Sequence, residues 1–167
     1  MAFSPRIILE WMPRLLYGFK ITLLAFGMGA VFSLAVGIIL GLARFILEEA
    51  PPVLVPFRWL LDFHIEFFRN VPLIVQLFFI FYGLPALGFS LSPFYSGLLG
   101  LTLCESAFIA EIMRGTLQGI PERDWEAAKA VAFSKSQIIR YVVLPQAWRD
   151  AIPSLLNQIS ITLKDTA

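Results

Sequence analysis

The chain has 167 residues, of which 58% are hydrophobic and only 15% are charged. Soluble domains carry about 25% charged residues, so this composition and the mean hydropathy of +0.77 predict a membrane protein with one domain over 1–167. The 13 lysines and arginines are balanced by 12 acids, which excludes the clustered basic surface that binding to nucleic acid requires.

The first part of the chain predicts an interfacial helix followed by a membrane span. Residues 4–20 mix aromatic, basic and apolar side chains, which suits a helix that anchors at the membrane surface without crossing it. Residues 21–43 carry no charge, and at about 1.5 Å per residue they cross the roughly 30 Å hydrocarbon core. Small residues recur at every fourth position of this span: Ala25, Gly29, Ser33, Gly37 and Gly41. We expect this stripe to let another helix approach closely, so that the span packs inside a bundle.

Two more spans are predicted at 71–91 and 94–113, after a short loop at 44–56. A helix that begins at Phe57 leads from the loop to the membrane. Three of its charged residues lie four apart on one face: Arg58, Asp62 and Glu66. We therefore expect this helix to enter the membrane obliquely.

A polar interval, the predicted cytoplasmic loop at about 114–143, separates the third span from a fourth one predicted at 144–163, and the longest polar stretch of the chain runs from Pro121 to Pro145. Pro121 fits the first turn of a helix, and the acidic residues after it lie where the helix dipole favours negative charge. These signals predict a short helix over roughly 122 to 131.

A second short helix is predicted to begin with a capping box. Ser134 and Gln137 have the spacing at which each side chain satisfies a free backbone N–H at the start of a helix. We therefore expect a tight turn near Ala132. We also expect Pro145 to interrupt the second helix, because a proline disfavours helical geometry at the residue before it, here Leu144.

Lysine and arginine are distributed unevenly between the two sides of the predicted spans. The turn at 85–93 has none, whereas the polar interval and its borders hold Arg114, Arg123, Lys129, Lys135, Arg140 and Arg149. Positive residues stay on the cytoplasmic side, so this interval is predicted to be cytoplasmic, which places the N-terminus outside.

A fixed spacing connects the polar interval to the start of the fourth span. It is formed by Glu126, Ala127, Ala128, Ala132, Val142, Leu144 and Pro145. This spacing resembles the coupling loop of permease subunits of ATP-binding cassette (ABC) importers, in which a glycine replaces Ala132 and an isoleucine replaces Val142. If the turn needs a positive φ, Ala132 costs about 1 to 2 kcal/mol there.

Flanking runs narrow the resemblance to the branch of these permeases that takes up polar amino acids. The runs are RNVPLIVQLFFIFYGLP from Arg69, AEIMRG from Ala110, and the LPQAWRDAIPSLLNQ and LKDT blocks that follow. The resemblance implies an all-α polytopic helix bundle of the type I importer fold with a cytoplasmic pair of coupling helices. Such permeases usually have five spans, of which four are visible here. We expect the chain to be either truncated before the fifth or a short form.

The resemblance also implies partners. An ATPase dimer would bind in the cytoplasm, a substrate-binding protein would deliver the cargo outside, and a second permease chain, identical or homologous, would complete the pathway in the bacterial inner membrane. The residues expected to couple to the ATPase are Glu126, Ala127, Ala128, Ala132, Leu144 and Pro145.

Motifs for catalysis are missing from the sequence. There is no G-x-x-x-x-G-K-S/T segment to cradle phosphates, and one histidine and one cysteine cannot supply a metal site or a nucleophile with its base. We therefore expect no catalytic, cofactor or metal site in this chain. ATP and Mg²⁺ would be bound by the partner ATPase.

The third span carries two acidic residues. Glu105 lies roughly 18 Å into the span, near the bilayer midplane, where an ionisable group is costly and usually functional. The resembled permeases usually have a small or uncharged residue there, so we hypothesise that Glu105 meets the positive group of a basic amino acid. The alternative is a protonated Glu105 hydrogen-bonded to a neighbouring helix. Glu111 lies three residues before Arg114 and is expected to form a structural ion pair. The resemblance places four further residues near the substrate path: Asn157, Lys164, Asp165 and Thr166.

Two other functions stay open at this point. A small channel or ion-coupled carrier without an ATPase would place charges along a pore and would transport in vesicles without ATP. A structural membrane subunit would have no substrate path, and the region at 156–166 would then tolerate change.

Overall fold

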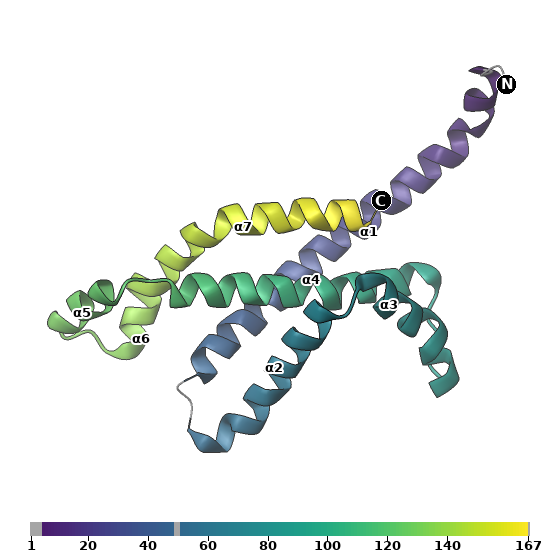
Figure 1. Ribbon diagram of the computed structural model, residues 1–167. Helices are drawn as coiled ribbons and strands as arrows, with labels where there is room; N and C mark the ends of the chain where they lie inside the picture. Colours follow the sequence, from purple (N-terminus) through teal and green to yellow (C-terminus); the bar gives the residue numbers. More distant parts are fainter. Residues whose placement is uncertain (1–4, 49–50, 167) are drawn as a thin grey trace.

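The computed structural model describes residues 5–48 and 51–166 of the chain. All regular elements in these residues are helical, which confirms the predicted all-α class. The helices are arranged around α4 (Pro93–Gln118), which α1 (Pro5–Leu47) crosses obliquely while α7 (Leu144–Asp165) runs beside it (Figure 1). Buried side chains occur along α4 from its first turn to its last, so α4 is the central helix of the molecule.

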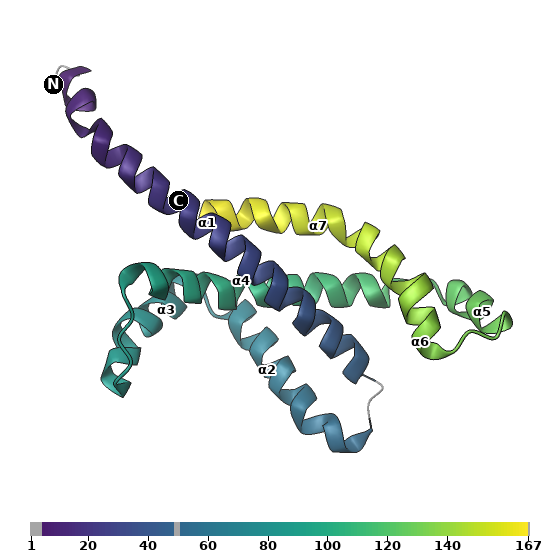
Figure 2. The same ribbon diagram turned by 180° about the vertical axis from the view of Figure 1, so that it is seen from behind.

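α1 is one continuous helix, although an interfacial helix and a separate span were predicted. No break occurs at Lys20, where the two were expected to meet, and Pro13 lies inside the helix. The helical hydrogen bonds continue because no further proline occurs before Pro51. Residues 10–20 are exposed, since this part of α1 extends away from the other helices (Figures 1 and 2). Ser4, the first residue of the predicted anchor, lies outside the described residues.

The small-residue stripe of α1 packs against α4. A Cβ atom added at Gly37 would lie 2.6 Å from the Cβ of Ile109, and one added at Gly41 would lie 2.6 Å from the backbone oxygen of Ala110. These two glycines therefore permit the close approach that the stripe predicted. The opposite face of α1 is exposed, so α1 lies on one side of the bundle instead of inside it.

A sharp bend separates α2 (Val55–Asn70) from α3 (Leu73–Phe78). The direction of the helix axis changes by 107° between the segments before and after this bend. Pro72 explains the break, because its ring favours an extended residue before it, and Val71 has φ −90° and ψ 125°. The oblique helix and the second span, predicted as neighbours, are thus two arms of a bent pair.

Gln76 fastens the two arms together. Its Nε2 donates hydrogen bonds to the backbone oxygens of Phe68 at 3.0 Å and Val71 at 2.7 Å, which the bend leaves without helical partners. The remaining short elements are a 3-10 turn before α2 and a π turn and a 3-10 turn after α3: η1 (Pro52–Leu54), η2 (Phe79–Gly83) and η3 (Leu84–Leu87). The stretch predicted as one straight span is therefore divided into short pieces.

Two helical stretches of the described residues are long and apolar enough to cross a membrane, 10–47 and 93–118. The bent pair adds a third if it forms one span. α7 occupies the place of the fourth predicted span, but it is not among the helices that meet this length and hydropathy. The arrangement with four spans stays a prediction.

Candidate functional site

The polar interval folds into a two-helix unit, which we define as residues 121–143. It contains α5 (Glu122–Ala130) and α6 (Lys135–Ile138), and α5 agrees with the helix predicted over 122–131. The predicted capping box is present, since the N–H of Ser134 donates to Oε1 of Gln137 at 2.8 Å. The local signals at both helix starts are therefore confirmed.

The turn between α5 and α6 is closed by Ala132 in a left-handed conformation, with φ 59°. The N–H of Ala132 donates to the oxygen of Lys129 at 2.9 Å, and the N–H of Phe133 donates to the oxygen of Ala128 at 3.2 Å. This pair of bonds ends many helices, with a glycine at the left-handed position. The condition stated for the turn is met, so Ala132 carries a strain of about 1 to 2 kcal/mol.

The second helix is not interrupted at Leu144, contrary to the prediction. Leu144 is helical, with φ −59° and ψ −45°, and α7 begins there. The irregular part is the π turn before it, η4 (Ile139–Val143), in which hydrogen bonds span five residues. Pro145 is accommodated because the first turn of a helix does not need its N–H.

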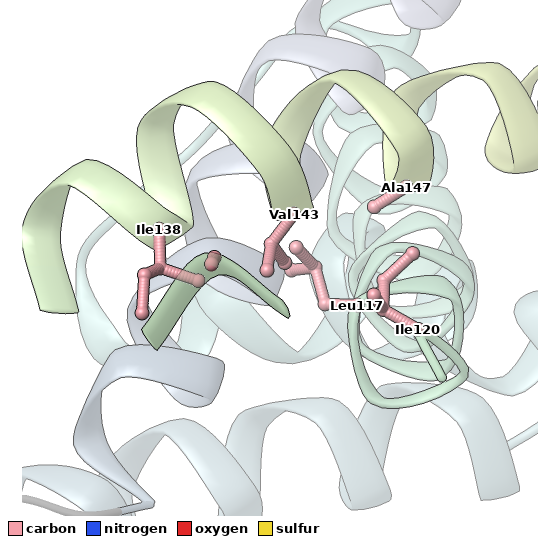
Figure 3. Close-up of a cluster of buried hydrophobic side chains, with 6 residues drawn as sticks. Leu117, Ile120, Ile138, Val143 and Ala147 are labelled. Carbon is pink, nitrogen blue, oxygen red and sulfur yellow. The ribbon is translucent and has the colours of Figure 1, made fainter. Parts of the chain in front are cut away.

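The two-helix unit shares one apolar core with the ends of α4 and α7 (Figure 3). The buried side chains of this core are Leu117, Ile120, Ala128, Ile138, Val143 and Ala147. Ala128 is only 6% exposed and faces this core, not a partner. Of the other expected coupling residues, one is half-buried and four are exposed: Leu144, then Glu126, Ala127, Ala132 and Pro145. Glu126 and Ala127 are thus the residues of the Glu-Ala-Ala motif that a partner can reach.

Glu111 binds arginines from three helices. Arg114, on α4 itself, donates to both carboxylate oxygens, which confirms the predicted pair. Nη1 of Arg44 on α1 donates to Oε2 at 2.8 Å, and Nη1 of Arg69 on α2 lies 3.6 Å from the same oxygen. The sequence could not indicate Arg44, because it lies 67 residues away along the chain. This cluster holds α1, α2 and α4 together.

Glu105 faces α7 and is only 1% exposed. Its Oε2 lies within hydrogen-bonding distance of Nε2 of Gln158, at 2.8 Å, and of Oγ1 of Thr162, at 2.7 Å. Neither partner was among the predicted site residues. Both continue the buried face of α7 that starts with Ala147 and Ala151, and this helical spacing is the signal that could have revealed them.

A cavity of about 550 Å³ is lined by residues from the start of α4 and the end of α7. These two helix ends lie away from the two-helix unit (Figure 1). Its wall is mostly apolar and includes Leu77 of α3 and Leu101 of α4. Its polar edge contains Asp165 and Thr166, at the end of α7. Two residues that the resemblance placed near a substrate path therefore line the same cavity.

The other three predicted residues of that path lie outside the lining. Asn157 and Lys164 are exposed on α7. Glu105 lies one turn of α4 beyond Leu101, is not part of the lining, and is close enough to Asp165 for the two carboxyl groups to interact.

Comparison with known proteins identifies the family to which this chain belongs. Residues 53–167 match the family of binding-protein-dependent transport system inner membrane components. The chain belongs to this family and is a permease subunit of an ABC transporter, as the coupling-loop spacing implied. Such subunits are not enzymes, and ATP is hydrolysed by a partner, as was expected for this chain.

Individual relatives agree with this assignment. The chain is 37% identical over 150 residues to a probable glutamine ABC transporter permease protein, GlnM, of Bacillus subtilis (strain 168), covering 90% of this chain and 67% of that relative. It is 31% identical over 156 residues to the arginine transport system permease protein ArtQ of the same organism, covering 93% and 68%. The crystal structure of an amino acid ABC transporter with histidines superimposes with a TM-score of 0.82 at 25% identity, over 99% of this chain and 75% of that one.

Proposed function

We propose that this chain is the permease of an ABC importer that moves a polar, positively charged amino acid across the bacterial inner membrane. The observation that carries the proposal is the acidic edge of the cavity beside α7. Asp165 lines that edge, and Glu105, which is not part of the lining, is close enough to interact with Asp165.

The cavity has the size and the chemistry for such a cargo. Its volume of about 550 Å³ falls within the range of small-molecule sites, roughly 300–1,000 Å³. The apolar wall suits the aliphatic part of a side chain, and a carboxylate binds an ammonium or guanidinium group through charge-assisted hydrogen bonds. Oγ1 of Thr166 donates to the oxygen of Leu163 at 2.9 Å, so its lone pairs remain to accept a bond from an amino group.

The relatives support an amino acid as the cargo. GlnM and ArtQ are named for glutamine and arginine, two polar amino acids of different charge. The acidic edge of this cavity favours the charged one.

Partners complete the proposed importer. An ATPase dimer with ATP and Mg²⁺ would bind the exposed face of α5, a substrate-binding protein would deliver the amino acid, and a second permease chain would complete the pathway. This chain would bind no cofactor itself.

The packing of the two-helix unit supports coupling through it. Leu117 of α4 and Ala147 of α7 belong to the same core as the unit, and the other ends of these two helices border the cavity. A push on Glu126 and Ala127 would therefore displace α4 and α7 as one packed body.

The test is ATP-driven uptake of arginine and glutamine into vesicles that contain the chain, its ATPase and a constant amount of its binding protein. The double change Glu105→Gln and Asp165→Asn should lower the ratio of arginine to glutamine uptake at least about tenfold, which corresponds to roughly 1.4 kcal/mol. Glu10→Gln, an exposed acid on the free part of α1, is the matched control and should keep the ratio. An unchanged ratio in the double variant would contradict a charge-selective cavity. Uptake without ATP would favour the channel or carrier.

A further inference from the structure

The two carboxyl groups at the cavity differ in their surroundings. Asp165 is exposed at the end of α7, whereas Glu105 is only 1% exposed. Within the described residues, the side chains that act on Glu105 are Gln158, Thr162 and Asp165, and none of them is cationic. A buried carboxylate without a cation is costly, and a second negative group beside it increases that cost.

The hydroxyl group of Thr162 adds an independent argument, because it has one proton and two acceptors within reach. They are Oε2 of Glu105 at 2.7 Å and the backbone oxygen of Gln158 at 3.0 Å. If Glu105 is ionised, Thr162 can donate to only one of them at a time. If Glu105 carries a proton, Glu105 donates to Thr162, and Thr162 donates to Gln158.

Gln158 then closes a ring of hydrogen bonds. Its Nε2 donates to Oε2 of Glu105 at 2.8 Å, while its backbone oxygen accepts from Thr162. All the short contacts in this ring are hydrogen bonds at the same time only when Glu105 is a donor. Buried polar networks are favourable when every member is bonded in this way.

We propose that Glu105 is a positioning residue, a neutral hydrogen-bond donor held by Gln158 and Thr162, and that Asp165 alone supplies the charge that selects a cationic substrate. This inference rests on the proposed function of the cavity. The positive group of an amino acid then meets a single negative charge in a half-open site, and no second charge has to be buried in the contact between α4 and α7.

Single variants in the complete transporter separate the two roles. Asp165→Asn should lower the ratio of arginine to glutamine uptake at least about tenfold, or roughly 1.4 kcal/mol. Glu105→Gln keeps a neutral donor to Thr162, and the side-chain amide of Gln158 can turn so that its oxygen accepts the second N–H, so this variant should change the ratio less than about twofold. Glu105→Leu cannot donate and should reduce the maximal rate for both substrates together, a loss that Glu105→Gln restores.

Infrared difference spectra give a second readout that does not depend on transport. We expect the carbonyl band of a protonated carboxylic acid, lost in Glu105→Gln and shifted in Thr162→Val, which removes the accepting hydroxyl. Absence of this band would overturn the inference. So would a loss of arginine preference in Glu105→Gln as large as that in Asp165→Asn. If even the double variant keeps its preference, the charge-selective cavity and the role of Asp165 both fail, while the band still decides whether Glu105 is neutral.

Discussion

The last turns of α4, near Leu117, and its middle, around Glu105, are built from different kinds of contact. Near Leu117, α4 meets the two-helix unit and α7 in a wholly apolar core. Around Glu105, it meets α7 through hydrogen bonds to Gln158 and Thr162, next to a cavity. An apolar core at native density moves as one body, whereas a hydrogen-bonded ring holds a defined pattern of donors and acceptors. Under the proposed function, the same pair of helices would transmit movement through the apolar core and select a substrate beside the cavity.

The largest effect is expected when a larger side chain is introduced into the apolar core that contains Leu117 and Ala128. Ala128 is only 6% exposed inside the shared core, so Ala128→Trp should destabilise the two-helix unit by about 3 kcal/mol or more. ATP-driven uptake should be lost, and the loop should become sensitive to limited proteolysis in membrane vesicles.

Ala127→Trp is the matched control, because Ala127 is the exposed neighbour on the same helix. Its loop should resist protease like the wild type, while binding of the ATPase weakens. Protease resistance in Ala128→Trp together with full uptake would show that the core of the unit is not needed for coupling.

A second large effect is expected where α1 touches α4. A Cβ atom at Gly37 would lie 2.6 Å from the Cβ of Ile109, so Gly37→Leu should lower the free energy of unfolding in detergent by about 2–3 kcal/mol. Gly27 has nothing within 4 Å of the same added atom, and Gly27→Leu should leave stability unchanged or raise it slightly. Equal losses in the two variants would mean that the stripe does not form this contact.

A moderate effect is expected at Glu111, which lies between Glu105 and Leu117 on α4. Glu111→Gln removes the charge that binds Arg44, Arg69 and Arg114, and a hydrogen bond to a charged group contributes about 1.5–3 kcal/mol. Because Glu111 is partly exposed, we expect the free energy of unfolding of the purified protein to fall by about 1.5 kcal/mol. Glu66→Gln, whose partner Asn70 is exposed, should have almost no effect. A loss in Glu66→Gln as large as that in Glu111→Gln would contradict a special role for the arginine cluster.

The two-helix unit and the surroundings of Glu105 also differ in how well the sequence predicted them. Ser134 and Gln137 form their capping box within four residues, so a local rule was sufficient to predict it. The prediction for Leu144 also rested on a local rule, but it was wrong. Ala147 and Ala151 are buried against the rest of the bundle, and this packing keeps α7 helical from its first turn.

The hydrogen-bonded region around Glu105 depends on contacts between distant parts of the chain. Gln158 lies 53 residues from Glu105, so no local pattern could show that the two side chains meet. The sequence indicated that Glu105 would be important at its depth, and it left open whether a substrate or a neighbouring helix would be its partner. Packing of α7 against α4 brings Gln158 and Thr162 within hydrogen-bonding distance of Glu105, and a role of Glu105 toward the substrate stays a prediction.

The smallest effect is expected at the turn of the two-helix unit, where the backbone of Ala132 is strained. Replacing Ala132, at φ 59°, with glycine should remove about 1–2 kcal/mol of strain, and the greater freedom of glycine in the unfolded chain offsets roughly 0.5–1 kcal/mol of that gain. The net stabilisation of the unit should therefore be about 0.5–1 kcal/mol, measured as slower hydrogen exchange of the α5 amides. Ala127→Gly, on the exposed face of the same helix, should instead lower stability by about 1 kcal/mol, because glycine disfavours a helix interior. If the two glycine variants exchange equally fast, Ala132 is not strained, and the departure from the family's glycine has no energetic consequence.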